Sequence, residues 1–255
     1  MDAFFLLIPA VALVASLITL ISGFGLGTLL LPVFALFFPL EVAIGLTAVV
    51  HLLNNLFKLG LLWKDIHWPT VLRFGVPGIV GAYLGARLMV LLGTREPLYH
   101  GVLHPVDPLD LVIAALMLIF GLLEISKRLN KLSLPSTWMV PGGVISGFFG
   151  GLSGHQGALR SLFLLRSGLA KEAFIATGVA IACLVDFTRL PTYARGDTPS
   201  IAREQWPLLL AATIAAFIGA WWGRKLIPKV TFRGVQLIVG VLILAIAGLL
   251  ASGTI

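Results

Sequence analysis

Two glycine clusters interrupt long apolar stretches of this sequence, and they limit its fold more than any other feature. The first cluster, at 22–28, reads SGFGLGT and lies inside an apolar run that extends from position 4 to position 38. The second, at 146–157, reads SGFFGGLSGHQG and follows about 130 residues later. In a bilayer, irregular backbone is tolerated only where protein or a water-filled cavity surrounds it. Two such interruptions at corresponding positions predict a transporter with its binding site between them.

The composition places the whole chain in a membrane. Of its 255 residues, 58% are hydrophobic and 11% are charged, whereas about 25% of the residues of a soluble domain are charged. We therefore expect a multi-pass protein of the cell membrane, with the lipid bilayer as a partner. The net charge of +7 does not indicate a nucleic-acid partner, because the lysines and arginines lie in short loops at the ends of apolar segments.

The apolar segments have the lengths of hairpin arms and of membrane spans. The second arm after each cluster has about ten residues or fewer, enough for roughly half of the hydrocarbon core. We therefore predict two hairpins that turn back inside the membrane, at 4–38 and 138–165. Three spanning helices are predicted after each: 41–62, 70–92 and 109–125 in the first half, and 171–190, 206–226 and 232–251 in the second.

The two halves of the chain, 1–130 and 137–255, read as a repeat. A shift that moves position 41 to position 172 aligns residues of the same kind, and a small gap aligns the motifs GAYLG and GAWWG. The aligned pairs are Glu41 with Glu172, Asn55 with Asp186, Lys58 with Arg189, and 81–85 with 219–223. Several matches in one register indicate two copies of one structural unit.

Basic residues indicate how the two halves are oriented. They occur in the loops 62–69, 126–137 and 223–231, and basic loops favour the cytoplasmic side. All three loops lie on that side only if each hairpin leaves the membrane where it entered. Three spans after each hairpin then reverse the orientation of the second half. The predicted fold is thus all-α, with two inverted repeats of a re-entrant hairpin and three transmembrane helices; hairpins that crossed fully would give parallel repeats.

The segment from Gly23 to Pro32 resembles the glycine-rich signature of the TauE/SafE sulfite-exporter family, which that family repeats in its second half, here around 150–157. The segments 81–85 and 219–223 resemble its third-helix motif. The resemblance covers nearly the whole chain and implies a transporter of sulfite, sulfonates or related small organic anions. This chain departs from the pattern where GHQG replaces a run of glycines at 154–157, where Leu162 replaces the proline, and where Arg160 aligns with Leu30.

Backbone amides at helix starts are the first candidate ligands for an anion. The free amides and the helix dipole both favour negative charge, and glycine permits close approach of the backbone. The candidates are Gly25, Gly27 and Thr28 in the first cluster, and Ser153, Gly154, His155, Gln156 and Gly157 in the second. The alternative is that these glycines only allow helices to pack closely.

Arg160 is the most specific single candidate, because it lies about one turn beyond Gly157 inside the membrane. A charge there costs about 2.5–3.5 kcal/mol on insertion scales. A guanidinium group can bind an oxyanion through two hydrogen bonds. The alternatives are an internal ion pair with Asp186, or a side chain that extends to the inner surface.

A polar stripe follows one face of the predicted span 41–62, with Thr47, His51, Asn55 and Lys58 at helical spacing. His51 lies about 15 Å from the start of the span, near the midplane. It is a candidate substrate donor or proton carrier, or else a buried neutral histidine. Asn55 is a candidate substrate or interhelical contact, and Lys58 is expected to extend to the inner surface.

The matching span, 171–190, carries the other candidate for coupling. Asp186 and Arg189 are three residues apart and can pair with each other, and Asp186 is the acid best placed to carry a proton. His51 and Asp186 are therefore the coupling candidates, for H⁺ or Na⁺. The single cysteine, Cys183, is expected to be a core residue, and no cofactor or metal is expected.

The sequence thus predicts a secondary-active transporter of a small organic or sulfur-containing anion, not an enzyme, that works by alternating access. The main rival is a passive anion channel with the same site. A cation carrier is disfavoured by Arg160. An intramembrane hydrolase is suggested by the motif GLSG at 151–154, but it needs a histidine base, and His155 is expected to be poorly placed beside Ser153. The oligomeric state stays open, a homo-oligomer included.

Overall fold

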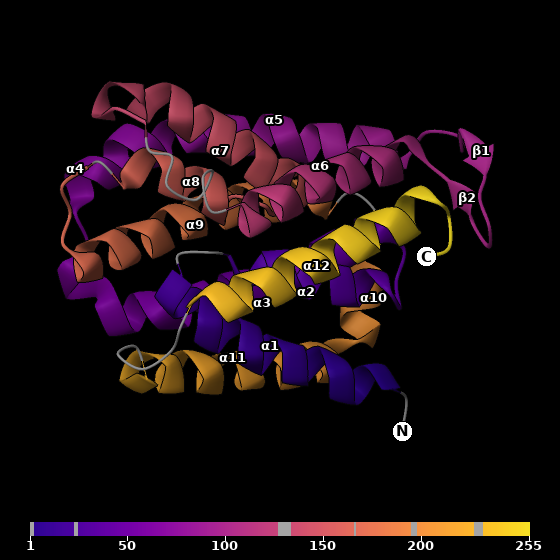
Figure 1. The fold of residues 1–255 in the computed structure, drawn as a ribbon, viewed down its shortest axis with the longest axis horizontal. Helices are drawn as coiled ribbons and strands as arrows, with labels where there is room; N and C mark the ends of the chain where they lie inside the picture. The colour runs from indigo at the N-terminus through magenta and orange to yellow at the C-terminus, as the bar shows by residue number, and fades with distance from the viewer. Residues whose placement is uncertain (1–2, 23–24, 127–133, 166, 195–197, 227–231) are drawn as a thin grey trace.

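The computed structural model describes residues 3–22, 25–126, 134–165, 167–194, 198–226 and 232–255. Helices make up almost all of it (Figure 1). The elements of the first half are α1 (Ala3–Ser22), α2 (Leu26–Ala35), α3 (Leu40–Leu62), η1 (Trp63–Asp65), α4 (Trp68–Thr70), η2 (Val71–Gly75), α5 (Val76–Gly93), β1 (Tyr99–His100), β2 (Pro105–Val106) and α6 (Pro108–Ile125). Those of the second are η4 (Ser136–Trp138), α7 (Met139–Ser153), α8 (Gly157–Leu164), α9 (Lys171–Tyr193), α10 (Thr198–Glu204), α11 (Trp206–Leu226) and α12 (Phe232–Ala251).

The predicted fold class, an all-α multi-pass membrane protein, is confirmed. Among the described residues, four helical segments are long and apolar enough to cross a membrane: Leu40–Asp65, Trp68–Gly93, Lys171–Tyr193 and Trp206–Gly223. They correspond to four of the predicted spans. The helices α6 and α12 have the bounds expected of the other two, within one residue.

The sequence did not predict a π-helical turn, a short helix or a small β-hairpin. A π-helical turn, η2, lies inside the predicted span 70–92, and the short helix α10 follows α9. Thr198, the first residue of α10, packs where Gly45 of α3 leaves space, since a Cβ atom on Gly45 would lie 2.7 Å from Thr198 Oγ1. The connection between α5 and α6 forms the small hairpin β1–β2, which holds the end of the chain through hydrogen bonds such as Val102 N to Ser252 O (2.9 Å).

Each glycine break lies at the tip of a hairpin whose two arms return to the same end of the molecule. In the first hairpin, the ring of Phe4 at the start of α1 lies 5.8 Å from the ring of Phe37, just beyond α2. In the second, the amide of Leu134 before α7 donates to the carbonyl of Leu162 in α8 (2.8 Å). Both segments therefore fold back as hairpins, while their re-entry into the membrane stays a prediction.

Close glycine contacts join each hairpin to the other half of the chain. A Cβ atom on Gly85 of α5 would lie 2.8 Å from Leu152 N of α7, and one on Gly219 of α11 would lie 3.1 Å from Leu17 N of α1. The helices α5 and α7 therefore pack backbone to backbone, and α11 and α1 pack in the same way. These are the small-residue contacts on which helix association in membranes depends.

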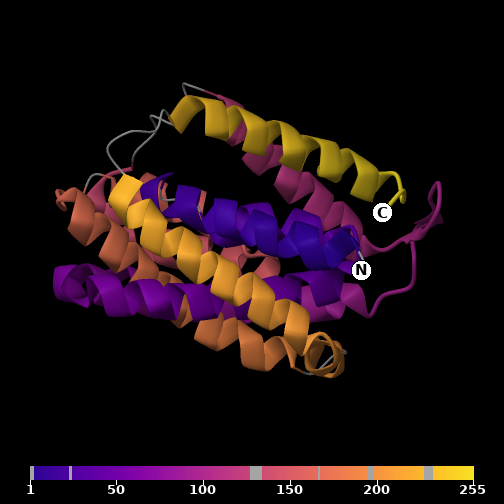
Figure 2. The ribbon, with the colours of Figure 1, turned by 90° about the horizontal axis from the view of Figure 1, so that it is seen from below.

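The remaining corresponding helices pack on each other in opposite directions. The start of α3 lies at the end of α9, where Gly45 meets Thr198, and its far end lies near the start of α9, where the amide of His67 donates to Thr177 Oγ1 (3.0 Å). The helices α6 and α12 also run antiparallel and lie together along one edge of the molecule (Figure 2).

Exchanging the halves turns the pair α5–α7 into the pair α11–α1 and leaves the pairs α3–α9 and α6–α12 unchanged, and antiparallel packing of corresponding helices is consistent with inverted repeats. The inverted repeat, with its boundaries at 1–130 and 137–255, nevertheless stays a prediction. Four of the seven basic residues behind the predicted orientation, Lys127, Arg128, Lys131 and Lys229, lie outside the described residues, as do Gly23 and Phe24 of the signature.

Candidate functional site

The two glycine breaks meet inside the molecule. Gly25 has an extended backbone and precedes α2, whereas Gly154 adopts a positive φ of 81° and ends α7, a conformation that favours glycine. A Cβ atom on Gly27 would lie 3.5 Å from the carbonyl oxygen of Gly154, and one on Gly25 would lie 3.5 Å from His51 Nε2. The breaks are therefore in contact with each other and with the polar face of α3, at buried positions.

A small cavity lies beside this contact, with a volume of about 30 Å³. One water molecule needs roughly 10–15 Å³ by this measure, so the cavity has room for two or three waters or one small solute. Its walls come from both halves of the chain. They include Gly25, His51, Asn55, Lys58, Arg160 and Gly178. Four of the predicted site residues are thus brought together, namely Gly25, His51, Asn55 and Arg160.

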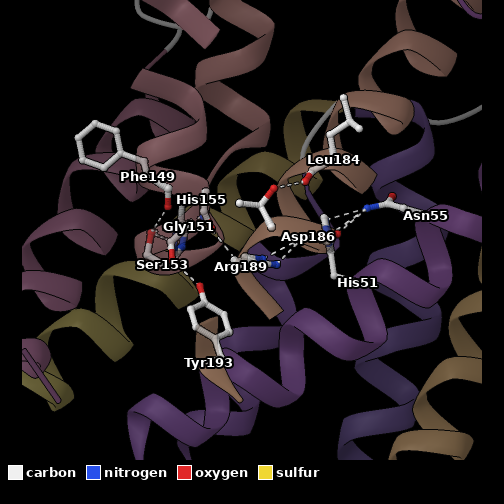
Figure 3. A network of polar contacts seen from close by, with 12 residues as sticks. His51, Asn55, Phe149, Gly151, Ser153, His155, Leu184, Asp186, Arg189 and Tyr193 are labelled. Carbon is white, nitrogen blue, oxygen red and sulfur yellow. Dashed lines mark hydrogen bonds and ion pairs between the residues drawn. The ribbon is translucent and has the colours of Figure 1, made fainter. Parts of the chain in front are cut away.

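A hydrogen-bonded network joins α3 to α9 at the edge of the cavity (Figure 3). His51 Nδ1 lies 2.6 Å from Asp186 Oδ2, and Asn55 Nδ2 donates to the same oxygen at 3.5 Å. On its other side, Asp186 Oδ1 accepts from Arg189 Nε at 2.9 Å and lies 2.8 Å from Arg189 Nη2. The predicted pairing of Asp186 with Arg189 is therefore present, and His51 shares the carboxylate.

Arg189 links this network to the end of α7. Its Nη1 donates to the carbonyl of Gly150 at 3.1 Å, and its guanidinium lies 5.9 Å from the ring centre of Tyr193. The hydroxyl of Tyr193 donates to the carbonyl of Gly151. A cation and a hydroxyl therefore occupy carbonyls in the last turn of α7, where the helix dipole is negative. Figure 3 shows Arg189 between Asp186 and the residues of the second break.

Arg160 lines the cavity and has no carboxylate partner among the described residues. It is 8% exposed, and its Nη1 is buried with no hydrogen-bond partner among the described residues. Its guanidinium lies over Gly178, where an added Cβ atom would come within 3.2 Å of Nε. Neither alternative from the sequence is seen here, since Asp186 pairs with Arg189 and His51 instead, and the side chain of Arg160 is buried against α9.

The sequence expectation for Lys58 was wrong, because this side chain does not extend to the inner surface. It is 3% exposed and lines the cavity. Its Nζ donates to Thr19 Oγ1 at 3.4 Å. When the amide of Asn54 is turned to suit its neighbours, its oxygen accepts from Lys58 Nζ at 3.1 Å and its nitrogen donates to the carbonyl of Ala216 at 3.2 Å. Lys58 was the missed site residue, and its place on the stripe with His51 was the signal that could have found it.

The buried charges of the described residues do not balance. The buried cations are Lys58, Arg160 and Arg189, and the only buried carboxylate among them is Asp186. Because Asp186 is bonded to Arg189, the charges of Lys58 and Arg160 are left without an anionic partner at the cavity. A buried charge without such compensation is costly, so the arrangement favours a negatively charged solute.

The remaining candidates from the second break do not line this cavity. His155 Nδ1 lies 3.1 Å from Ser153 Oγ, so the two are closer than the sequence suggested, but Ser153 Oγ donates to the carbonyl of Phe149 (3.0 Å). The ring of His155 stacks on Phe120 at 5.3 Å. The side-chain amide of Gln156 is buried and has no partner among the described residues.

The other helix-start candidates lie in the first turns of α8 and α2. Gly157 is the first residue of α8, and Gly27 and Thr28 lie in the first turn of α2.

The single cysteine, Cys183, is buried, as expected of a core residue. No group of three or more His, Cys, Asp or Glu side chains that could hold a metal ion occurs in the part of the chain that the structure describes.

Comparison with known proteins gives one match. The family model described as Sulfite exporter TauE/SafE matches residues 8–250. No curated protein and no solved structure matches the chain. The match spans the second hairpin, the first hairpin from residue 8 onward, both glycine breaks and every residue that lines the cavity.

Proposed function

Because the chain belongs to the sulfite exporter TauE/SafE family, a family of membrane transporters, we propose that it carries a small organic or sulfur-containing oxyanion across the cell membrane. The substrate binds in the cavity between the two glycine breaks. Arg160 binds it through the guanidinium group, and the backbone at Gly25 lets it approach closely. The single observation that supports this most is the buried guanidinium of Arg160, whose Nη1 has no partner within the described residues.

The cavity is lined by helices from both halves of the chain, which supports alternating access. Its walls come from α1, α2 and α3 of the first half and from α8 and α9 of the second, and inverted repeats place such a site at their interface. Gly27 of the first break contacts Gly154 of the second, so the two hairpins touch each other near the cavity. Movement of the two hairpins relative to α3 and α9 would open one side and close the other.

His51 and Asp186 provide a route for coupling to protons. A carboxylate only accepts hydrogen bonds, so His51 Nδ1, 2.6 Å from Asp186 Oδ2, carries a proton. His51 Nε2, on the side of Gly25, can then donate to a substrate only when the ring gains a second proton. Proton binding and anion binding would strengthen each other to the same extent, as linkage requires.

The rival function is a passive anion channel that uses the same groups. Uptake into proteoliposomes distinguishes the two, because a coupled transporter accumulates its substrate against a concentration gradient when a proton or sodium gradient is applied. A channel only dissipates the substrate gradient. The substrates to compare are sulfite, methanesulfonate, sulfate and a short carboxylate.

The variant that tests the proposed site is Arg160→Ala. Loss of a charged hydrogen-bond donor costs about 1.5–3 kcal/mol, so anion affinity should fall by about 10- to 150-fold while the protein still inserts. Arg203→Ala is the matched control, because Arg203 is exposed on α10, and it should leave affinity unchanged. Unchanged affinity in Arg160→Ala would remove Arg160 from the site.

A further inference from the structure

Two cations from different halves of the chain face the same small cavity, Lys58 from α3 and Arg160 from α8. We propose that Lys58 and Arg160 together select doubly charged oxyanions over singly charged ones. This inference rests on the proposed function, since it specifies the charge of the solute bound at the same site. It also gives Lys58 a role in specificity.

Among the described residues, Lys58 has only neutral oxygen partners. An ammonium group has three donors. Thr19 Oγ1 accepts one of them, and the Asn54 amide oxygen accepts another in its favoured orientation. The remaining donor belongs to a side chain that lines the cavity. Thr19 and Asn54 therefore fix the position of the ammonium group without neutralising its charge.

Arg160 is held in a similar way. The absence of a side chain at Gly178 lets the guanidinium lie against α9, 3.2 Å from the position that a Cβ atom would take. Its Nη1 is unpartnered within the described residues. Each cation is thus positioned by groups without charge, and each retains a donor for a solute.

The number of uncompensated charges specifies the charge of the solute. Arg189 lies 2.8 Å from Asp186 and neutralises it, and no other carboxylate is buried among the described residues. Two positive charges remain at the cavity. A singly charged anion leaves one of them uncompensated, whereas a doubly charged anion balances both, and uncompensated charge is costly in a desolvated site.

Binding of sulfate and methanesulfonate to the purified full-length protein tests this selection. The two ions are similar in size and tetrahedral shape and differ by one charge. The wild type should bind sulfate at least about 10-fold more tightly, a difference of roughly 1.4 kcal/mol. In Lys58→Met, sulfate affinity should fall by about 10- to 100-fold, with less than about a threefold change for methanesulfonate.

Lys58→Arg and Lys64→Met are the comparison variants. Lys58→Arg keeps the charge and should keep the preference for sulfate, which separates the effect of charge from a failure to fold. Lys64 is exposed just beyond the end of α3, so Lys64→Met should behave as wild type. Equal affinity of the wild type for both ions, or an equal loss for both in Lys58→Met, overturns this inference alone. If the wild type binds none of the anions tested, the proposed function is overturned with it.

Discussion

The helices α3 and α9 occupy corresponding places in the chain, yet they use their charged residues differently. On α9, Asp186 and Arg189 bind each other, and Arg189 also binds the carbonyl of Gly150. On α3, Lys58 occupies the position that aligns with Arg189, but Asn55 stands where α9 has its aspartate. Lys58 therefore has a hydroxyl and an amide as partners, and no carboxylate stands three residues before it on α3.

This difference separates a structural charge from a functional one. The α9 pair is internally neutral and ties the helix to the end of α7, so its removal should lower stability in addition to disturbing the proton coupling proposed for Asp186. The α3 charge is held in place but not neutralised, so its removal should mainly affect the solute. A basic residue at this position of the repeat thus acts structurally when an aspartate lies one turn before it, as on α9, and remains available to a solute when an asparagine stands there, as on α3.

The largest effect should come from breaking the α9 pair. Asp186→Asn leaves Arg189 buried without its carboxylate, and removing one partner of a buried ion pair costs about 3–5 kcal/mol. The free energy of unfolding, measured by denaturation in detergent, should fall by that amount. Asp65→Asn, at an exposed position, should change it by less than about 0.5 kcal/mol. An Asp186→Asn protein as stable as the wild type would show that the α9 pair is not structural.

The two glycine-packed helix pairs extend the comparison to the hairpins. A Cβ atom on Gly81 would lie 2.7 Å from Phe148 N, and one on Gly219 would lie 3.1 Å from Leu17 N. Gly81→Ala and Gly219→Ala should each cost about 1–3 kcal/mol of stability by overpacking.

Glycines with free space provide the control for these two variants. Gly60 and Gly248 have nothing within 4 Å of the added atom, so alanine there should stabilise the helix by about 0.5–1 kcal/mol. A loss at Gly81 without a loss at Gly219 would mean that the two pairs are not equivalent.

His51 tests whether the contact between α3 and α9 carries a proton. The groups around it are Asp186 and Arg189 on α9, Lys58 and Asn55 on α3, and Arg160 on α8. In the wild type, anion affinity should rise as the pH falls from about 8 to 5, because histidine gains charge in this range. His51→Gln should bind the anion with little dependence on pH.

The control for this pH profile is His100→Gln, in the exposed hairpin β1–β2. It should keep the wild-type dependence, because His100 lies far from the cavity in the chain and is not among its walls. If His51→Gln responds to pH as the wild type does, the proton is carried elsewhere.

The smallest effect should come from Gly178, which leaves space for Arg160. In Gly178→Ala the added atom would lie 3.2 Å from Arg160 Nε, so the guanidinium must shift by a few tenths of an ångström. Anion affinity should fall by about 3- to 10-fold, or roughly 1 kcal/mol, with stability nearly unchanged. Gly60→Ala on α3 should leave affinity as it is. An unchanged affinity in Gly178→Ala would mean that anion binding does not depend on the close contact between Arg160 and Gly178.

Much of the fold could be predicted because apolar length and glycine clusters act locally. The observed helix α9, Lys171–Tyr193, matches the predicted span 171–190, and both hairpins fold back as expected. The short helix α10 could not be found in this way, because its place depends on the space at Gly45. A contact between distant segments leaves no periodic pattern in the sequence.

The candidate site could be predicted only in part. Arg160 and His51 stood out because charged and ionisable groups are rare inside membranes, and both line the cavity. The orientation of a short helix end is harder to predict, which is why His155 and Gln156, although buried, lie away from it. The expectation for Lys58 failed because its partners, Thr19 and Asn54, come together only in the folded protein.

The position of a bound oxyanion can be measured directly with selenate, a doubly charged ion that scatters X-rays anomalously. Crystals of the protein grown with selenate should show an anomalous peak within hydrogen-bonding distance of Arg160 Nη1 and Lys58 Nζ, between the two glycine breaks. Crystals of Arg160→Ala should lack it. A selenate ion found at another place in the protein, with the cavity between Arg160 and Lys58 holding none, would contradict the proposed site.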